Sequence, residues 1–143
     1  MKLKVALKKL DQELFNINYN FNSQYWELVI FTQNYDIKAE YKGKFLADVL
    51  KEHFKEKIDF KSSLEVYYQD GYRNLSLNYD NTDFSDNFIT LSLNDKYEYT
   101  RTFCLNNIED LAFKLENLNS LFTDYEIDLT QIFKEAREYG LYR

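Results

Sequence analysis

No residue of this chain is proline, and only three of its 143 residues are glycine: Gly43, Gly71 and Gly140. Proline and glycine are the residues that most often interrupt regular structure and build flexible linkers. Their scarcity argues against a loop-rich fold, so Asn and Asp have to supply most turns. The length fits one hydrophobic core, and we expect a single domain over residues 1–143.

Helical and strand spacings alternate along the first part of the chain. Apolar residues at helical spacing predict an amphipathic helix over 2–14. Three strands follow, over 16–22, 25–32 and 35–41, and their short connections predict an antiparallel meander. The second of these strands is almost continuously apolar, so we expect it to be covered on both faces. Helical spacing returns over 45–57 and predicts a central helix.

Two hairpins are predicted next. Asp70-Gly71 separates alternating runs at 64–69 and 73–79, and Asp-Gly is a strong signal for a two-residue hairpin turn. The runs 88–93 and 96–103 form the second hairpin around Asn94-Asp95.

Two helices are predicted to close the chain. Asn107 caps the first, whose apolar face reaches Phe122; Asp128 with Gln131 caps the second, over 129–139, which ends at Gly140. The fold class is therefore α+β: an antiparallel sheet, made of the meander plus two hairpins, packed with an N-terminal helix, a central helix and two C-terminal helices.

Residues 25–57 and 87–119 align without gaps at an offset of 62 residues, in the order strand, turn, strand, helix. Duplication and shared strand–helix patterning both account for this similarity, and the sequence leaves both open.

The residues needed for catalysis are scarce. His53 is the only histidine, so a Ser–His–Asp or Cys–His site would have to use it, and its place at the rim of a helix's apolar face favours a structural role. Cys104 is the only cysteine, which excludes an internal disulfide and favours a buried thiol in a reducing compartment. No Gly-rich phosphate loop is present. We expect no enzyme activity, no cofactor and no metal site.

The spacing of lysines and apolar residues also predicts no targeting or membrane-spanning segment. Lysines interrupt the first apolar residues, and the longest apolar run, 28–31, is too short to cross a bilayer. No basic face with interleaved aromatic residues is visible, so we expect no direct contact with nucleic acid. The expected location is the cytoplasm, without membrane association.

Charge is distributed unevenly. Residues 1–61 contain 11 Lys and 9 Asp or Glu, whereas residues 62–143 contain 7 Lys or Arg and 15 Asp or Glu. An acidic field repels nucleic acid and attracts basic proteins. Tyrosines among the acids supply aromatic anchors for such a contact. The candidate partner-binding residues are Asp70, Tyr72, Asp80, Asp83, Phe84, Asp86, Asp95 and Glu98.

These features favour a non-enzymatic inhibitor that masks a basic, nucleic-acid-acting protein, such as an immunity protein that neutralises a bacterial toxin. A phage- or plasmid-encoded inhibitor of a defence nuclease, of the anti-CRISPR type, has the same physical requirements. The order helix, three strands, helix, strands, helix also resembles that of class I type III secretion chaperones, and this resemblance in element order implies a chaperone role. The sequence leaves open whether the protein is a monomer or a homodimer.

Overall fold

A computed structural model of the chain describes residues 1–60, 73–82, 86–93 and 99–140. Within these ranges it contains four helices and one six-stranded antiparallel sheet, which confirms the α+β class. The elements are α1 (Leu3–Leu10), β1 (Leu14–Asn20), β2 (Tyr25–Phe31), β3 (Ile37–Gly43), α2 (Leu46–Phe54), β4 (Arg73–Asp80), β5 (Phe88–Leu93), β6 (Tyr99–Cys104), α4 (Ile108–Glu116) and α5 (Leu118–Glu138). None of these helices is long and apolar enough to cross a lipid bilayer.

The strands lie in the order β3-β2-β1-β4-β5-β6. The expected meander of β1, β2 and β3 is present, and so is the hairpin of β5 and β6. The other expected hairpin joins 64–69 to 73–79; in the described part of the chain, 73–80 form β4, which pairs with β1 and β5. Residues 64–69 and Asp70-Gly71 lie outside the described residues. The alternating buried residues Leu75, Leu77 and Tyr79 belong to a strand in the centre of the sheet.

The sheet contains two similar halves, each of three strands followed by a helix. Leu28 of β2 pairs with Tyr41 of β3, and Ile89 of β5 pairs with Phe103 of β6 in the corresponding place. Tyr41 and Phe103 are 62 residues apart, as the ungapped alignment requires, but Leu28 and Ile89 are 61 apart. The alignment is therefore wrong by one residue in this strand. Because successive residues of a strand point to opposite faces, an error of one residue would place Leu28 on the wrong face of the sheet.

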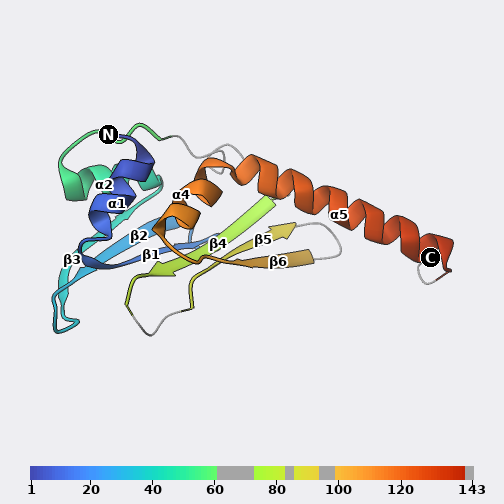
Figure 1. Cartoon of the computed structure of the whole chain (residues 1–143), viewed down its shortest axis with the longest axis horizontal. Coiled ribbons are helices and arrows are strands. Elements are labelled where there is room, and N and C mark those ends of the chain that lie inside the picture. The colour runs from blue at the N-terminus through green and yellow to red at the C-terminus, as the bar shows by residue number, and fades with distance from the viewer. Residues whose placement is uncertain (61–72, 83–85, 94–98, 141–143) are drawn as a thin grey trace.

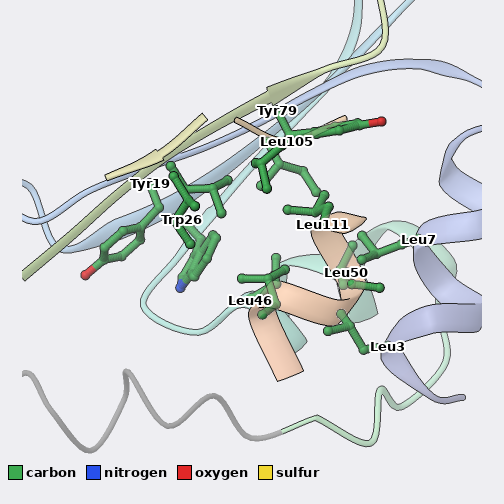
Figure 2. Packing of buried hydrophobic residues seen from close by; sticks show 14 of the residues in the cluster. Leu3, Leu7, Tyr19, Trp26, Leu46, Leu50, Tyr79, Leu105 and Leu111 are labelled. Carbon is green, nitrogen blue, oxygen red and sulfur yellow. The ribbon is translucent and has the colours of Figure 1, made fainter. Parts of the chain in front are cut away.

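All described helices cover one face of the sheet (Figure 1). Between this face and the helices, leucines of α1, α2 and α4 form one buried cluster with Tyr19 and Trp26, the two largest fully buried side chains (Figure 2). The opposite face has no helix in the described parts of the chain. Consequently β2 is covered on one face only, contrary to expectation, and Tyr25 and Glu27 are exposed.

Two C-terminal helices are present as expected, but the boundary between them lies at a different residue from the one predicted. The Asn107 side chain accepts a hydrogen bond from the N–H of Asp110 at 2.8 Å and caps α4, as predicted. The division falls at Asn117, and α5 then continues unbroken for 21 residues. Asp128 is therefore no cap. Its carboxylate pairs with Arg101 of β6, and this pair ties the middle of α5 to the sheet.

Tight turns use residues other than glycine. Gln24, Tyr35 and Lys55 adopt left-handed backbone angles, with φ of 60°, 64° and 57°. Lys55 ends α2 in the position that glycine most often takes. Gly140, with φ of 69°, follows α5 as the sequence predicts.

Candidate functional site

The face of the sheet that points away from the helices, here called the open face, carries mainly uncharged polar side chains on β1, β4, β5 and β6. Successive residues of a strand point to opposite faces, so the residues between the buried positions lie here. On β1, β4, β5 and β6 they are Leu14, Asn16, Asn18, Asn20, Asn74, Ser76, Asn78, Asp80, Phe88, Thr90, Ser92, Thr100, Thr102 and Cys104. Asp80 is the one charged residue among them. Such a face can form many hydrogen bonds with little desolvation of charge.

Several of these side chains hold one another in place. Asn78 accepts hydrogen bonds from Asn16, at 3.0 Å, and from Asn18, at 3.5 Å. Across β5 and β6, the hydroxyl groups of Thr90 and Thr102 lie 3.0 Å apart. These contacts restrict the rotamers in advance, and this reduces the entropy lost when a partner binds.

Carboxylates gather at one end of the sheet, and we call this cluster the acidic end. Its members are Asp11 after α1, Asp80 at the end of β4, Asp86 before β5, and Glu109 and Asp110 in the first turn of α4. Lys8 and Lys9 border Asp11 on the last turn of α1, and Lys114 pairs with Asp110. The excess of negative charge is therefore greatest over Asp80, Asp86 and Glu109.

The side chains of two asparagines hold the backbone at the acidic end in place through hydrogen bonds. Asn81 Oδ1 accepts the N–H of Phe15 at 2.9 Å, and its Nδ2 donates to the carbonyl of Glu13 at 2.6 Å. Asn87 bonds to both backbone groups of Asp80, at 2.8 and 2.9 Å. The two ends of the connection between β4 and β5 are thus fixed to the sheet.

The electrostatics of this end follow from its composition. Burial, with added repulsion from Asp11, Glu109 and Asp110, raises the pKa of Tyr79 to about 12. Burial also opposes ionisation of Asp110, but hydrogen bonds from the Lys114 ammonium and the Asn106 N–H outweigh it and lower the pKa of this carboxyl group. Asp110 is thus neutralised locally by Lys114, whereas Glu109 and Asp86 are exposed and have no ion-pair partner among the described residues.

Of the eight predicted partner-binding residues, the structure places Asp80 and Asp86 together at the acidic end. The other six, Asp70, Tyr72, Asp83, Phe84, Asp95 and Glu98, lie outside the described residues. The strand ends that precede and follow 94–98, Leu93 and Tyr99, pair with each other at the opposite end of the sheet from Asp80. The sequence interpretation missed Asp11, Glu109 and Asp110, because they come close to Asp80 only through the topology.

The His53 side chain on α2 contacts two residues of the first half, Glu13 and Tyr41. Its Nε2 lies 2.7 Å from Glu13 Oε2, and its Nδ1 lies 3.1 Å from the Tyr41 hydroxyl. The side chain is 14% exposed, at the rim of the α2 apolar face as predicted. Its two contacts join α2 to β3 and to the residue before β1, which fits a structural role.

Cys104 is exposed, contrary to the expected buried thiol. It is the last residue of β6, where the strand alternation points it to the open face beside Phe88. Phe103, its neighbour in sequence, takes the position toward the helices.

The described residues include no group of three His, Cys, Asp or Glu side chains placed to hold a metal ion. Comparisons of the chain with protein-family models, with curated proteins and with solved structures gave no match. The site is therefore defined by its own geometry: the mainly uncharged, hydrogen-bonding part of the open face over β1, β4, β5 and β6, next to a cluster of carboxylates.

Proposed function

We propose that this protein is a non-enzymatic inhibitor that masks a basic, nucleic-acid-acting protein, as an immunity protein masks a toxin. The observation that supports the proposal most directly is the continuity of the open face with the acidic end. Protein interfaces commonly have few charges at their centre and more at their rim. Here Asn16, Asn18 and Asn78 form the centre, and Asp80 and Asp86 lie at the rim.

The charges of the acidic end suit a cleft that binds phosphates. A nuclease surface must be basic in order to attract nucleic acid, and a cluster of carboxylates can compete with the phosphates for that surface. Asp86 and Glu109 are exposed and free to make such contacts, while Asn81 and Asn87 keep the surrounding backbone fixed. A rigid acidic surface speeds association and loses little conformational entropy on binding.

The proposal is tested with a charge reversal at the acidic end. Asp11→Lys combined with Asp86→Lys changes two exposed residues whose carboxylates have, at most, the weak 3.3 Å contact of Asp11 with Asn81. The matched control, Glu52→Lys with Glu138→Lys, changes the net charge equally at exposed helix positions elsewhere. All three proteins serve as tagged bait in extracts of the native host.

We expect the wild type and the control to capture a basic protein that acts on nucleic acid, and the acidic-end variant to lose it. With the purified partner, the association rate should fall about tenfold in the variant and should decrease as salt rises from about 0.05 to 0.5 M. Adding the wild-type chain should stop cleavage of nucleic acid by the partner. Equal rates for both double variants, or a captured protein whose activity does not change, would overturn the proposal.

The identity of the captured protein separates the related functions. A toxin indicates immunity, a defence nuclease indicates an inhibitor of the anti-CRISPR type, and a secreted effector bound through an extended segment indicates a chaperone. The last outcome would contradict the inhibitor proposal, because a chaperone need not suppress the activity of the protein it binds.

A further inference from the structure

A second candidate site lies on the open face, at the end opposite the acidic end. It is a cavity of about 570 Å³, here called the neutral cavity. Its polar lining residues are Asn22, Gln24, Asn74, Ser92 and Thr100, and its apolar lining residues are Phe21 and Leu93. Asn74, Ser92 and Thr100 are cross-strand partners on β4, β5 and β6, and the turn between β1 and β2 supplies the rest.

The polar side chains that line the neutral cavity are all amides or hydroxyl groups. Each side-chain amide offers both donors and an acceptor, and each hydroxyl group can donate or accept. No charged residue is among the described residues that line it. The amides and hydroxyl groups of the described lining match a neutral ligand with many hydrogen-bonding groups.

The walls of the cavity are ordered before any ligand binds. Asn20 closes the β1–β2 turn: its Oδ1 accepts the Asn22 N–H at 2.8 Å, and its carbonyl accepts the Gln24 N–H at 2.9 Å. On the opposite wall, the hydroxyl groups of Ser92 and Thr100 lie 3.3 Å apart. Fixed donors and acceptors lower the entropic cost of binding a small molecule.

We propose that the neutral cavity binds a neutral, hydroxyl-rich small molecule, of the class of mono- and disaccharides. A sugar hydroxyl group both donates and accepts, which matches the amides and hydroxyl groups of the lining. The C–H face of a pyranose ring is apolar and suits contact with Phe21. The volume lies within the range typical of small-molecule sites. The cavity shares Asn74, Ser92 and Thr100 with the open face but no residue with the acidic end, and sugar binding does not require the proposed inhibitor function.

The test is a ligand-observed NMR titration of the full chain with four probes: glucose, maltose, glucose 6-phosphate and glucosamine. We expect saturable binding of at least one of the two neutral sugars, and weaker binding of both charged probes. Asn74→Ala should weaken the binding of the neutral sugar about tenfold, through the loss of one or two hydrogen bonds. Gln24→Gly removes a second lining side chain, at a position whose backbone suits glycine, and should weaken binding similarly.

Thr90→Val is the matched control for these variants. Its hydroxyl group pairs with Thr102 in the neighbouring row of the same strands, outside the cavity, so affinity should not change. Thermal melting of each variant verifies folding, so a loss of binding can be assigned to the cavity. The proposal is overturned if neither neutral sugar binds, if glucose 6-phosphate or glucosamine binds more tightly, or if Thr90→Val weakens binding as much as Asn74→Ala.

Discussion

Asn81 shows how one amide can define the local structure of this protein. Its side chain contacts Phe15, Glu13 and Asp11, which come from the loop after α1 and from β1, while its own backbone continues β4. A half-buried amide with several partners is difficult to replace, because every partner left without a bond adds a desolvation cost. The acidic end therefore depends on an uncharged residue for its shape.

Replacing this residue should destabilise the fold measurably. We expect Asn81→Ala to lower the free energy of unfolding by about 2 kcal/mol, since it removes hydrogen bonds to the Phe15 N–H and the Glu13 carbonyl. Urea unfolding at neutral pH measures the effect. Asn34→Ala, at an exposed turn position, is the control and should change this free energy by less than about 0.5 kcal/mol. Equal effects of the two substitutions would contradict the role assigned to Asn81.

Tyr79 gives a prediction for alkaline pH. Its pKa rises from 10.0 to about 12 in the folded protein, so the folded state binds this proton more tightly than the unfolded chain. The corresponding stability is complete below pH 10 and is lost as the pH rises toward about 12. Tyr79→Phe should therefore make the free energy of unfolding less dependent on pH in this window. Urea unfolding at several alkaline pH values tests this, with Tyr35→Phe, at an exposed turn, as the control. An unchanged slope for Tyr79→Phe would contradict it.

At the scale of single elements, α5 is joined to the sheet by two arginines. Arg73 of β4 makes two hydrogen bonds to Glu126, at 2.6 and 2.9 Å, and its guanidinium lies 5.6 Å from the Phe122 ring centre. The pair of Arg101 with Asp128 is more exposed, at 43% and 55%. Since water screens exposed ion pairs, the two contacts should differ in strength.

Neutral substitutions can compare the two contacts. Glu126→Gln should lower the free energy of unfolding by about 1 kcal/mol, because the Arg73 guanidinium then loses a charged partner at a site of low exposure. Asp128→Asn should change it by less than about 0.5 kcal/mol. The measurement is urea unfolding at low and high salt. A larger effect at Asp128 than at Glu126 would show that the more exposed pair is the anchor.

The elements also show what local sequence can and cannot predict. Alternating Leu75, Leu77 and Tyr79 identified a strand, and Asn107 identified a helix start, because both signals depend only on neighbouring residues. The continuity of α5 was also present in the pattern: Phe122, Tyr125 and Leu129 maintain helical spacing across the expected division. The partners of β4 were not predictable in this way, since strand pairing depends on residues far apart in the chain. The acidic end, assembled from residues 11, 80 and 109, was missed for the same reason.

At the scale of the whole molecule, the two three-stranded halves share one core. They meet where β1 pairs with β4, and the leucines of α1 and α4 pack in the same buried cluster. Neither half encloses its apolar face alone, because α1 of the first half packs on α4 of the second. The molecule should therefore behave as one cooperative unit.

Cooperativity can be tested with probes in each half. Trp26, the only tryptophan, is buried in the first half, so its fluorescence reports unfolding there. Amide hydrogen exchange of Leu75, Ile89 and Leu91 reports the second half. We expect one urea transition by fluorescence and circular dichroism, with these amides exchanging at the free energy of global unfolding. Two separated transitions would show that the halves are independent units.

The left-handed turn residues affect how the protein could be adapted to higher temperature. Tyr35 and Lys55 adopt backbone angles that cost a side-chain-bearing residue roughly 1 kcal/mol. Both are exposed, and neither belongs to the core, the acidic end or the neutral cavity. Directed evolution for heat tolerance would therefore find glycine or asparagine favourable at these two positions. Because this chain uses so little glycine, substitutions at these turns could raise its thermal stability without changing the acidic end or the neutral cavity.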